Sequence, residues 1–397
     1  MADSNIIIQT YKYRLYPSKS QIKRLLLILE VARSFYNMCL GERKAAYEVE
    51  GRNVTRKEQN RQVKHYKRTF PQAKQIHSHI LQVVVADIDD AFQQFFKRVK
   101  RGEKPGYPRF KGRNRFRSFG LKEYTNGFWI DGRRLKITGV GRISMRWHRP
   151  IPENAKIKTV RICYQGGKWY ACLACEIPKP KPKPKTGRVV GLDMGITALI
   201  TSHEGEKLPN PKHYRQGQAE LRRLQRKLAR AKRGSKNCAK ALRQVQRQQA
   251  HIANQRRDYL HKLTHILIKH CDGIAIEDLS IPNMVRNHRL SKSIFDSGWG
   301  IFKDLLVYKA ESAGRKVVLV NPAYTSQTCS NPECHESLES LTLADRWVIC
   351  LHCGLSLDRD HNAARNILDR AGWFAPVSPN VEQWLVRAAE ATRIVPL

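Results

Sequence analysis

The chain has 397 residues, of which 41% are hydrophobic, so it is long enough for two or three domains with sizeable cores, and global disorder is excluded. It carries 73 Lys and Arg against 34 Asp and Glu, a formal charge of +39 that predicts a polyanionic partner. The sequence contains no apolar run long enough to cross a membrane, so nucleic acid fits this charge better than a lipid surface does. A basic structural protein of ribosomal type is the alternative, because charge identifies a partner class and no chemistry.

The first part of the chain alternates between strand and helix patterns. Residues 5–16 contain the β-branched and aromatic residues of a strand, and Ser18 follows as a helix N-cap. Apolar residues then recur at helical spacing over about 19–50 and 75–100. We therefore expect residues 18–103 to form a helical insertion.

Strand patterns return after these helices, with a hairpin predicted at Gly166 and Gly167. Because strand-rich segments flank the helical insertion, residues 1–17 and 104–180 are predicted to form one β domain. Alternating Pro and Lys follow, and they favour an extended, stiff and charged linker, which we place at residues 181–186.

Beyond this linker the pattern is that of an α/β domain. VVGLDMGITALITS predicts a strand, a turn and a second strand, and a very basic helical hairpin follows over 214–270 with a break near Gly234. GIAIE and KVVLV predict two short buried strands further along. The order of these elements suits an α/β fold. The tail, residues 373–397, contains a short predicted helix near 380–392 and has no assignable role.

Two acidic residues lie at the ends of the apolar strands. Asp193 follows Val-Val-Gly-Leu, and Glu277 follows Ile-Ala-Ile. A carboxylate in such a setting costs free energy unless it has a partner. Asp193 could instead start a turn, because Gly195 follows it closely. Asp278 is expected to point away from Glu277 and to cap the next segment.

A third acid lies at a predicted helix start, where Asp358 and Asp360 precede His-Asn-Ala-Ala. Acidic residues are favoured at a helix N-terminus, and capping explains one Asp better than two. Asp360 adjoins the face that would pack on a sheet, so we choose it first and Asp358 second. Acids from two strands and a helix start suit a phosphodiesterase that uses two Mg²⁺ ions, which prefer carboxylate oxygens.

Four cysteines have the spacing of a zinc site. Cys329 and Cys334 are followed, after fifteen residues, by Cys350 and Cys353. Four thiolates complete a tetrahedral Zn²⁺ shell, so the ion is expected to be structural and not catalytic. No signal peptide opens the sequence, and we expect a cytoplasmic protein whose cysteines stay reduced.

Two further motifs resemble metal sites and are not expected to be metal sites. Cys172 and Cys175 lie three residues apart in a predicted strand, where they face opposite sides, and core packing is the expected role. His77 and His79 lie two apart in a predicted helical segment, where their side chains are expected to diverge.

With these motifs assembled, the chain resembles the TnpB family, the OrfB-type proteins of bacterial insertion sequences that are related to miniature type V CRISPR effectors. The similar segments are YKYRLYPSKSQ, PGYPRFKG, GLDMG, IEDL, DSGWG, YTSQTC, CLHCG and DRDHNAARNIL. The resemblance implies a multidomain α+β fold. An RNase H-like (RuvC) α/β nuclease domain would occupy 187–328 and 354–372, with a zinc knuckle inserted at 329–353. The β domain would be a barrel-like wedge domain and the helical insertion a recognition lobe.

The resemblance also implies an RNA-guided DNA endonuclease that is encoded by a transposable element and cuts double-stranded DNA beside a short adjacent motif. Its catalytic acids, which hold two Mg²⁺ ions, fall on Asp193, Glu277 and Asp360, and its ligands for one structural Zn²⁺ fall on the four cysteines. The expected partners are a guide RNA from the transposon end and the target DNA, bound by a monomer. The alternatives are an RNA-guided repressor that has lost an acid and does not cut, and a basic RNA-binding structural protein.

Contacts to nucleic acid are predicted at three places. Gln82 is the candidate for reading the motif beside the target, and Tyr11 and Tyr13 could stack on bases, with core packing as their other possible role. The basic hairpin suits the phosphates of an RNA–DNA heteroduplex. Its candidate residues are Arg222, Arg223, Arg226, Lys227 and Arg230.

Overall fold

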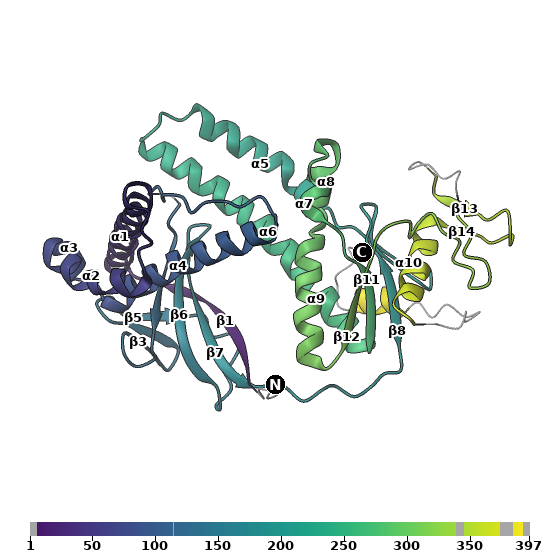
Figure 1. Ribbon diagram of the computed structural model, residues 1–397, viewed down its shortest axis with the longest axis horizontal. Helices are drawn as coiled ribbons and strands as arrows, with labels where there is room; N and C mark the ends of the chain where they lie inside the picture. The colour runs from purple at the N-terminus through teal and green to yellow at the C-terminus, as the bar shows by residue number, and fades with distance from the viewer. Residues whose placement is uncertain (1–5, 114, 339–344, 374–383, 392–397) are drawn as a thin grey trace. The chain divides into compact units, whose positions relative to one another are not determined.

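The computed structural model describes residues 6–113, 115–338, 345–373 and 384–391 (Figure 1). The chain forms two compact units, Met1–Lys179 and Pro180–Leu397, which are described separately below. Within the described ranges, no helix combines the length and the apolar character needed to cross a bilayer.

The first unit contains a seven-stranded sheet in which every neighbouring pair is antiparallel. Its strands are β1 (Ile6–Tyr16), β2 (Ser118–Lys122), β3 (Phe128–Asp131), β4 (Arg134–Ile137), β5 (Gly141–Met145), β6 (Lys156–Gln165) and β7 (Lys168–Pro178). They lie in the order β2-β6-β7-β1-β5-β4-β3. The first strand of the chain therefore lies in the middle of the sheet, because its long partner β7 and the shorter β5 flank it.

Four helices connect β1 to β2. They are α1 (Lys19–Glu50), α2 (Arg56–Thr69), α3 (Pro71–Lys74) and α4 (Ser78–Lys100). Helix α1 begins where the sequence predicts, because the Ser18 hydroxyl accepts a hydrogen bond from the Gln21 amide, and it ends at Gly51 with a φ of 62°. These helices and the sheet bury their apolar residues in a single core, in which Phe35, Ile80 and Leu173 are fully buried.

The second unit is built on a five-stranded mixed sheet. Its strands are β8 (Val189–Asp193), β9 (Ala198–Ser202), β10 (Lys207–Pro209), β11 (Gly273–Glu277) and β12 (Lys316–Val320). The order is β10-β9-β8-β11-β12. Strands β8, β11 and β12 are parallel, and β9 runs antiparallel to both of its neighbours.

Helices cover both faces of this sheet (Figure 1). The helices described in the second unit are α5 (His213–Arg230), α6 (Lys236–His270), α7 (Ile281–Met284), α8 (His288–Ser297), α9 (Trp299–Ala313), α10 (Arg359–Arg370) and α11 (Trp384–Ala391), of which α5 packs against α6. Val190 and Ile274 point into the core formed with α6 and α9. The alternate residue Ala275 packs against Ile367 of α10 on the opposite face. Beyond α9, β13 (Trp347–Ile349) and β14 (Ser356–Asp358) form a small antiparallel hairpin.

The Pro/Lys segment is where the sequence predicts an extended, stiff and charged linker. It has no regular secondary structure, but its second half is held against the end of α9. The Lys183 amide donates to the Ala313 carbonyl at 2.9 Å, and Arg315 Nη2 donates to the Pro184 carbonyl at 2.8 Å. Part of the segment is therefore anchored to the second unit.

The predicted helix of the tail is α11, and it also belongs to the second unit. The Glu206 carboxylate accepts hydrogen bonds from the backbone amides of Leu385 and Val386, which lie in its first turn. Trp384 Nε1 donates to Glu204 at 2.7 Å. The remaining residues of the tail, 374–383 and 392–397, lie outside the described part of the chain.

Candidate active site and cysteine cluster

Asp193 and Glu277 end two neighbouring parallel strands. The register pairs Leu192 of β8 with Ile276 of β11, so the next residue of each strand is an acid. Paired residues of parallel strands point to the same face of the sheet, and alternate residues share that face. Both carboxylates are therefore on the face that α10 covers, since Ala275 packs against that helix.

Helix α10 approaches this face closely because β8 has no side chain at Gly191. A Cβ atom at Gly191 would lie 2.4 Å from the Ala364 carbonyl oxygen and 2.7 Å from the Leu368 Cβ atom. Ala364 is fully buried, as expected for a small residue at the point of closest contact. This contact places the N-terminus of α10, where Asp358 and Asp360 lie, beside the carboxyl ends of the strands.

The two acids at the start of α10 have different surroundings. Asp358 is the N-cap, because its Oδ1 accepts hydrogen bonds from the amides of Asp360 and His361 at 3.0 and 3.2 Å. Its other oxygen accepts from Lys207 Nζ at 2.6 Å. Asp360 lies in the first turn, and Arg346 Nη1 lies 4.0 Å from its Oδ1. Capping therefore accounts for Asp358, and Asp360 is the acid that remains available for another ligand.

The electrostatics of the acids show that they are neighbours. Burial raises the pKa of Asp193 well above its usual value, and the charges of Glu277 and Asp360 raise this pKa further. Burial also raises the pKa of Glu277, against the opposing effect of a hydrogen bond from Thr325 and of the Arg370 charge. A cation at this site would relieve the repulsion between the carboxylates.

The carboxylates are not gathered as tightly as the cysteines are. Among the described residues, the four cysteines form the only group of at least three His, Cys, Asp or Glu side chains whose ligand atoms lie close enough for one ion. The predicted acids therefore share a region of the sheet edge, and the structure does not bring all three around a single point.

Asp278 does not have its predicted role as a cap. The segment that follows, α7, has Ser280 at its N-cap position, two residues beyond Asp278. The Asp278 carboxylate instead accepts from Lys303 Nζ of α9 at 2.9 Å, on the outside of the unit. The prediction fails because the apolar strand ends in a short turn before the helix begins.

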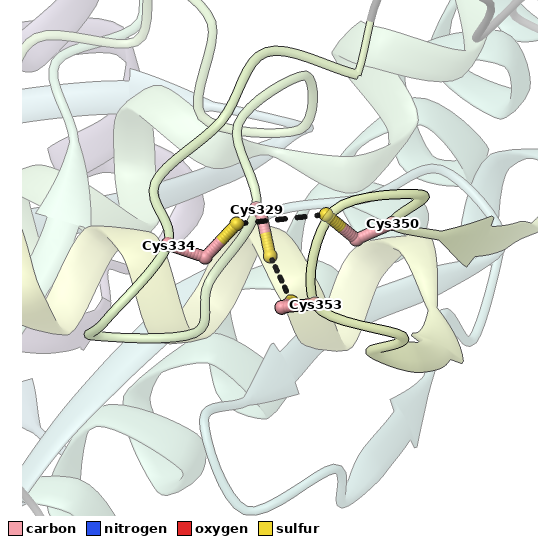
Figure 2. Close-up of side chains that lie close together, drawn as sticks. All are labelled: Cys329, Cys334, Cys350 and Cys353. Atoms are coloured by element: carbon pink, nitrogen blue, oxygen red, sulfur yellow. Dashed lines mark hydrogen bonds between the residues drawn. The ribbon is translucent and has the colours of Figure 1, made fainter.

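The four predicted zinc ligands converge (Figure 2). Their sulfur atoms all lie within 4.8 Å of one another, and the Cys329–Cys353 and Cys334–Cys350 pairs are 3.6 Å apart. A sulfur tetrahedron around an ion with bonds of about 2.3 Å has edges of about 3.8 Å, so this spacing fits Zn²⁺. It is far beyond the length of about 2.05 Å of a disulfide bond.

Two loops hold these cysteines. In the first, the Cys334 amide donates to the Asn331 carbonyl at 3.0 Å, and in the second the Gly354 amide donates to the Cys350 carbonyl at 2.9 Å. Gly354 has a φ of 74°, which glycine adopts without strain. Hydrogen bonds from the Asn331 side chain and the Leu355 amide lower the pKa of the Cys353 thiol to about 6. Cys353 is therefore favoured as the thiolate that a metal requires, whereas burial raises the pKa of the Cys329 thiol to about 12.

Comparison with known proteins shows relatives along nearly the whole chain. Residues 172–288 match the family model described as "Probable transposase" (OrfB of IS605). A protein of Streptomyces pristinaespiralis named "Putative RNA-guided DNA endonuclease" is 35% identical over 91% of this chain and 88% of its own length. The chain belongs to the TnpB family. InsQ of Escherichia coli strain K12, which carries the same description, is 30% identical to this TnpB protein over 91% of this chain and 92% of its own.

Two further models match this TnpB chain. Residues 299–367, which include the cysteine cluster and most of α10, match a "Cas12f1-like, TNB domain". Residues 4–52 match a "Helix-turn-helix domain", but in the structure this segment is one strand, β1, followed by the single 32-residue helix α1. The fold resembles that of Cas12f1 in a complex with sgRNA and target DNA, with a TM-score of 0.57 and 14% identity over 92% of this chain and 99% of that one.

The predicted nucleic-acid contacts of this TnpB protein differ in exposure. All five candidate cations of α5 are exposed, because Leu221, Leu224 and Leu228 form the seam that packs against α6. Arg223 is already paired with Glu220, with two contacts of 2.7 Å. Gln82 is half-buried on α4.

Tyr11 and Tyr13, which the sequence allowed either to stack on bases or to pack in a core, both pack in the core. Tyr11 and Tyr13 are 3% and 0% exposed in the core of the first unit. The Tyr13 ring stacks on Trp147 with a centroid distance of 4.9 Å, and its hydroxyl donates to the Arg149 carbonyl.

The predictions for the Cys172/Cys175 and His77/His79 motifs, neither of which was expected to bind a metal, have different outcomes. Cys175 is fully buried and Cys172 is on the other side of β7, so the predicted alternation is confirmed. The expectation that His77 and His79 diverge is wrong, since their ring centroids are 4.5 Å apart. His77 is the N-cap of α4 in an extended conformation, and the geometry of residues two apart inside a helix does not apply to it.

Sequence reasoning missed three polar residues beside the acids. Thr325 donates a hydrogen bond to Glu277, and Asn362 and Asn366 of α10 bond the loop that carries Thr325. All three are buried. The only signal in the sequence is that the two asparagines lie four residues apart on a helix whose neighbouring residues are apolar, which places both on the buried side.

Proposed function

We propose that this chain is an RNA-guided DNA endonuclease with one RuvC-type, metal-dependent site formed by Asp193, Glu277 and Asp360. The observation that carries the proposal is geometric: Asp193 and Glu277 end neighbouring parallel strands on the face that α10 covers, and Asp360 lies in the first turn of α10. Family relatives described as RNA-guided DNA endonucleases align with almost the whole chain, which supports this substrate class.

The arrangement of the second unit supports a nuclease domain of the RNase H-like class over 187–328 and 354–372. Ligands of α/β sheets bind at the carboxyl ends of parallel strands, and Asp193 and Glu277 are the last residues of two such strands. The mixed sheet, with β9 antiparallel to its neighbours and helices on both faces, is consistent with this class.

The three acids fit a site for two Mg²⁺ ions. Their oxygens are the hard ligands that Mg²⁺ prefers, and their repulsion is relieved by positive charge. Bound ions would supply an activated water and would neutralise charge on the leaving oxygen of a phosphodiester. The protein itself positions the carboxylates through the β8–β11 register and through the close contact of α10 at Gly191.

The cysteine cluster fits one structural Zn²⁺ ion, and we assign residues 329–353 to a zinc knuckle. Four thiols at tetrahedral spacing leave no open position for a substrate. Strand β14 leads directly from the cluster to Asp358 and α10. The knuckle therefore supports the end of the helix that carries Asp360.

The partners that fit are a guide RNA and double-stranded DNA. The formal charge of +39 and the exposed cations of α5 suit phosphate contacts, and base pairing with a guide would supply the sequence specificity. We assign the first unit to a β wedge domain, residues 1–17 and 104–180, and a helical recognition lobe, residues 18–103. A repressor without cleavage is disfavoured because all three acids are present.

The decisive experiment uses the full chain with the RNA that co-purifies with it. In Mg²⁺, this complex should cleave DNA that matches the RNA, and Asp193→Ala should abolish cleavage while DNA binding remains. Asp278→Ala is the matched control. It removes the carboxylate that directly follows Glu277 and that pairs with Lys303 on the outside of the unit. Normal cleavage by Asp193→Ala would refute the assignment of the site.

A further inference from the structure

The loop that leads to the cysteine cluster reaches the acid face of the sheet at one residue, Thr325. Its hydroxyl lies 2.5 Å from Glu277 Oε1 and 3.2 Å from the Pro322 carbonyl oxygen. A threonine hydroxyl has one hydrogen to donate, and the shorter distance indicates that Glu277 receives it. Thr325 is 4% exposed and Glu277 is 7% exposed, so water does not compete freely for this bond.

Asn366 of α10 fixes the position of Thr325. Its side-chain Nδ2 donates to the carbonyl oxygens of both Thr325 and Thr328, at 2.8 and 2.7 Å. Asn366 is 3% exposed, and loss of its amide would remove the bond to the Thr325 carbonyl, whereas the Thr328 carbonyl would keep a bond from Asn362. The same helix that carries Asp360 therefore holds the loop that contacts Glu277.

Asn362, one helical turn earlier, extends this connection to the cysteine cluster. Its Nδ2 donates to the Thr328 carbonyl at 2.8 Å, and its Oδ1 accepts from the Ser330 amide at 3.0 Å. These two bonds enclose Cys329, the first candidate zinc ligand. Asn362 is fully buried, and its amide uses both its donor and its acceptor on the loop.

The backbone at this point adopts a conformation that must be held. Tyr324 has a φ of 60°, which costs a residue with a side chain of this kind about 1 kcal/mol or more. Its side chain is 71% exposed, so packing of the ring does not compensate this cost. The buried hydrogen bonds of the next residue, Thr325, compensate this conformational cost.

We propose that Thr325 is a positioning residue for Glu277, and that Asn366 and Asn362 hold Thr325 in place so that the cysteine cluster and the carboxylates are assembled together. The hydroxyl fixes one oxygen of Glu277 and leaves the other directed to a cation. The inference rests on the proposed function, because it assigns a task to Glu277 as a metal ligand. Mutation of a residue that orients a metal ligand typically weakens metal affinity by about 10- to 100-fold.

The main test compares Thr325→Val with Thr325→Ser. Valine keeps the volume and removes the hydroxyl, whereas serine keeps the hydroxyl. Thr325→Val should raise the Mg²⁺ concentration for half-maximal cleavage by about 10- to 100-fold and retain much of the rate at saturating Mg²⁺, and Thr325→Ser should restore the wild-type value. Thr159→Val is the matched control, because that side chain is exposed in β6 of the first unit, away from the acids and the cysteine loop.

A second readout does not depend on cleavage. Calorimetric titration of Mn²⁺ into the zinc-loaded protein without nucleic acid should show binding that Asp193→Ala removes and Thr325→Val weakens. Zinc content should stay at one equivalent in each variant, which separates a positioning effect from loss of the cluster. Wild-type Mg²⁺ and Mn²⁺ dependence in Thr325→Val would overturn the inference. If Asp193→Ala also behaved as wild type, the proposed function would fall with it.

The role of Asn366 is tested by combining variants. If Asn366 acts by holding Thr325, then Asn366→Ala should weaken Mn²⁺ binding, and the double variant with Thr325→Val should be no weaker than the worse single variant. Losses that multiply would show that the two residues act separately and would refute the connection. Thermal unfolding of each variant shows whether the fold is retained.

Discussion

The close contact between β8 and α10 can be tested with a single methyl group. Gly191→Ala would place a Cβ atom 2.4 Å from the Ala364 carbonyl oxygen and 2.7 Å from the Leu368 Cβ atom. Ordinary contact requires about 3.5 Å, so α10 must move away by about 1 Å. The obstacle is helix backbone, which cannot rotate aside as a flexible side chain can.

This displacement should reduce both stability and cleavage. Overpacking of this kind costs about 1–3 kcal/mol, which for a unit of this size lowers the melting temperature by roughly 2–12 °C. Because Asp360 moves with α10, a displacement of about 1 Å should also lower the cleavage rate about 100-fold at temperatures where the variant is folded.

The matched control is Gly300→Ala in α9. A Cβ atom at Gly300 has no heavy atom within 4 Å, so alanine there should leave cleavage unchanged and stabilise the helix by up to about 1 kcal/mol. Both variants are compared by thermal unfolding and by cleavage of matched DNA in Mg²⁺. Wild-type stability and cleavage in Gly191→Ala would show that α10 does not depend on this contact.

Two other predictions concern charge and zinc. Burial and the neighbouring acids raise the pKa of Asp193 in the folded chain, so its contribution to stability is complete below about pH 4 and is lost as pH rises through that higher pKa. Without Mg²⁺, Asp193→Asn should therefore flatten the fall in melting temperature with rising pH, and an unchanged slope would contradict the electrostatic argument. Cys350→Ser should lose the bound zinc and make the segment from 329 to 353 sensitive to protease, while the first unit stays resistant. Unchanged protease resistance together with loss of zinc would show that the metal does not hold the knuckle.

Local signals explain what the sequence could predict. The N-terminus of α1 follows from Ser18 and Gln21, whose side chains and backbones bond each other within four residues. Asp193 and Glu277 could be found because a charged residue at the end of an apolar strand is unusual whatever the rest of the fold is. The cysteine cluster follows from spacing alone, because two short loops are enough to bring the thiols together.

The features that escaped prediction depend on contacts between distant segments. Thr325 is one of several small polar residues in a loop, and its importance appears only when β11 lies beside that loop. Helix α2 was not separated from its neighbours because its composition is strongly polar, and only Gln59, Val63 and Tyr66 are buried. The position of Asp278 directly after a strand predicts a helix cap, but α7 begins later, with Ser280 at its N-cap position.

The positive charge of the chain favours binding of nucleic acid, whereas cleavage at the acidic site requires divalent cations. A chain with a formal charge of +39 attracts the phosphates of a nucleic acid, yet the site proposed for cleavage consists of carboxylates that repel them. Burial raises the pKa of Asp193, and the charges of Glu277 and Asp360 raise this pKa further. A phosphate can approach these acids only if divalent cations lie between the two sets of negative charge.

Binding and cutting should therefore separate in the absence of Mg²⁺, and removal of an acid should weaken cutting without weakening binding. A variant such as Asp193→Ala that bound DNA less well than the wild type would mean that the acids support the fold or the cation-free complex, and the division of labour argued here would be wrong.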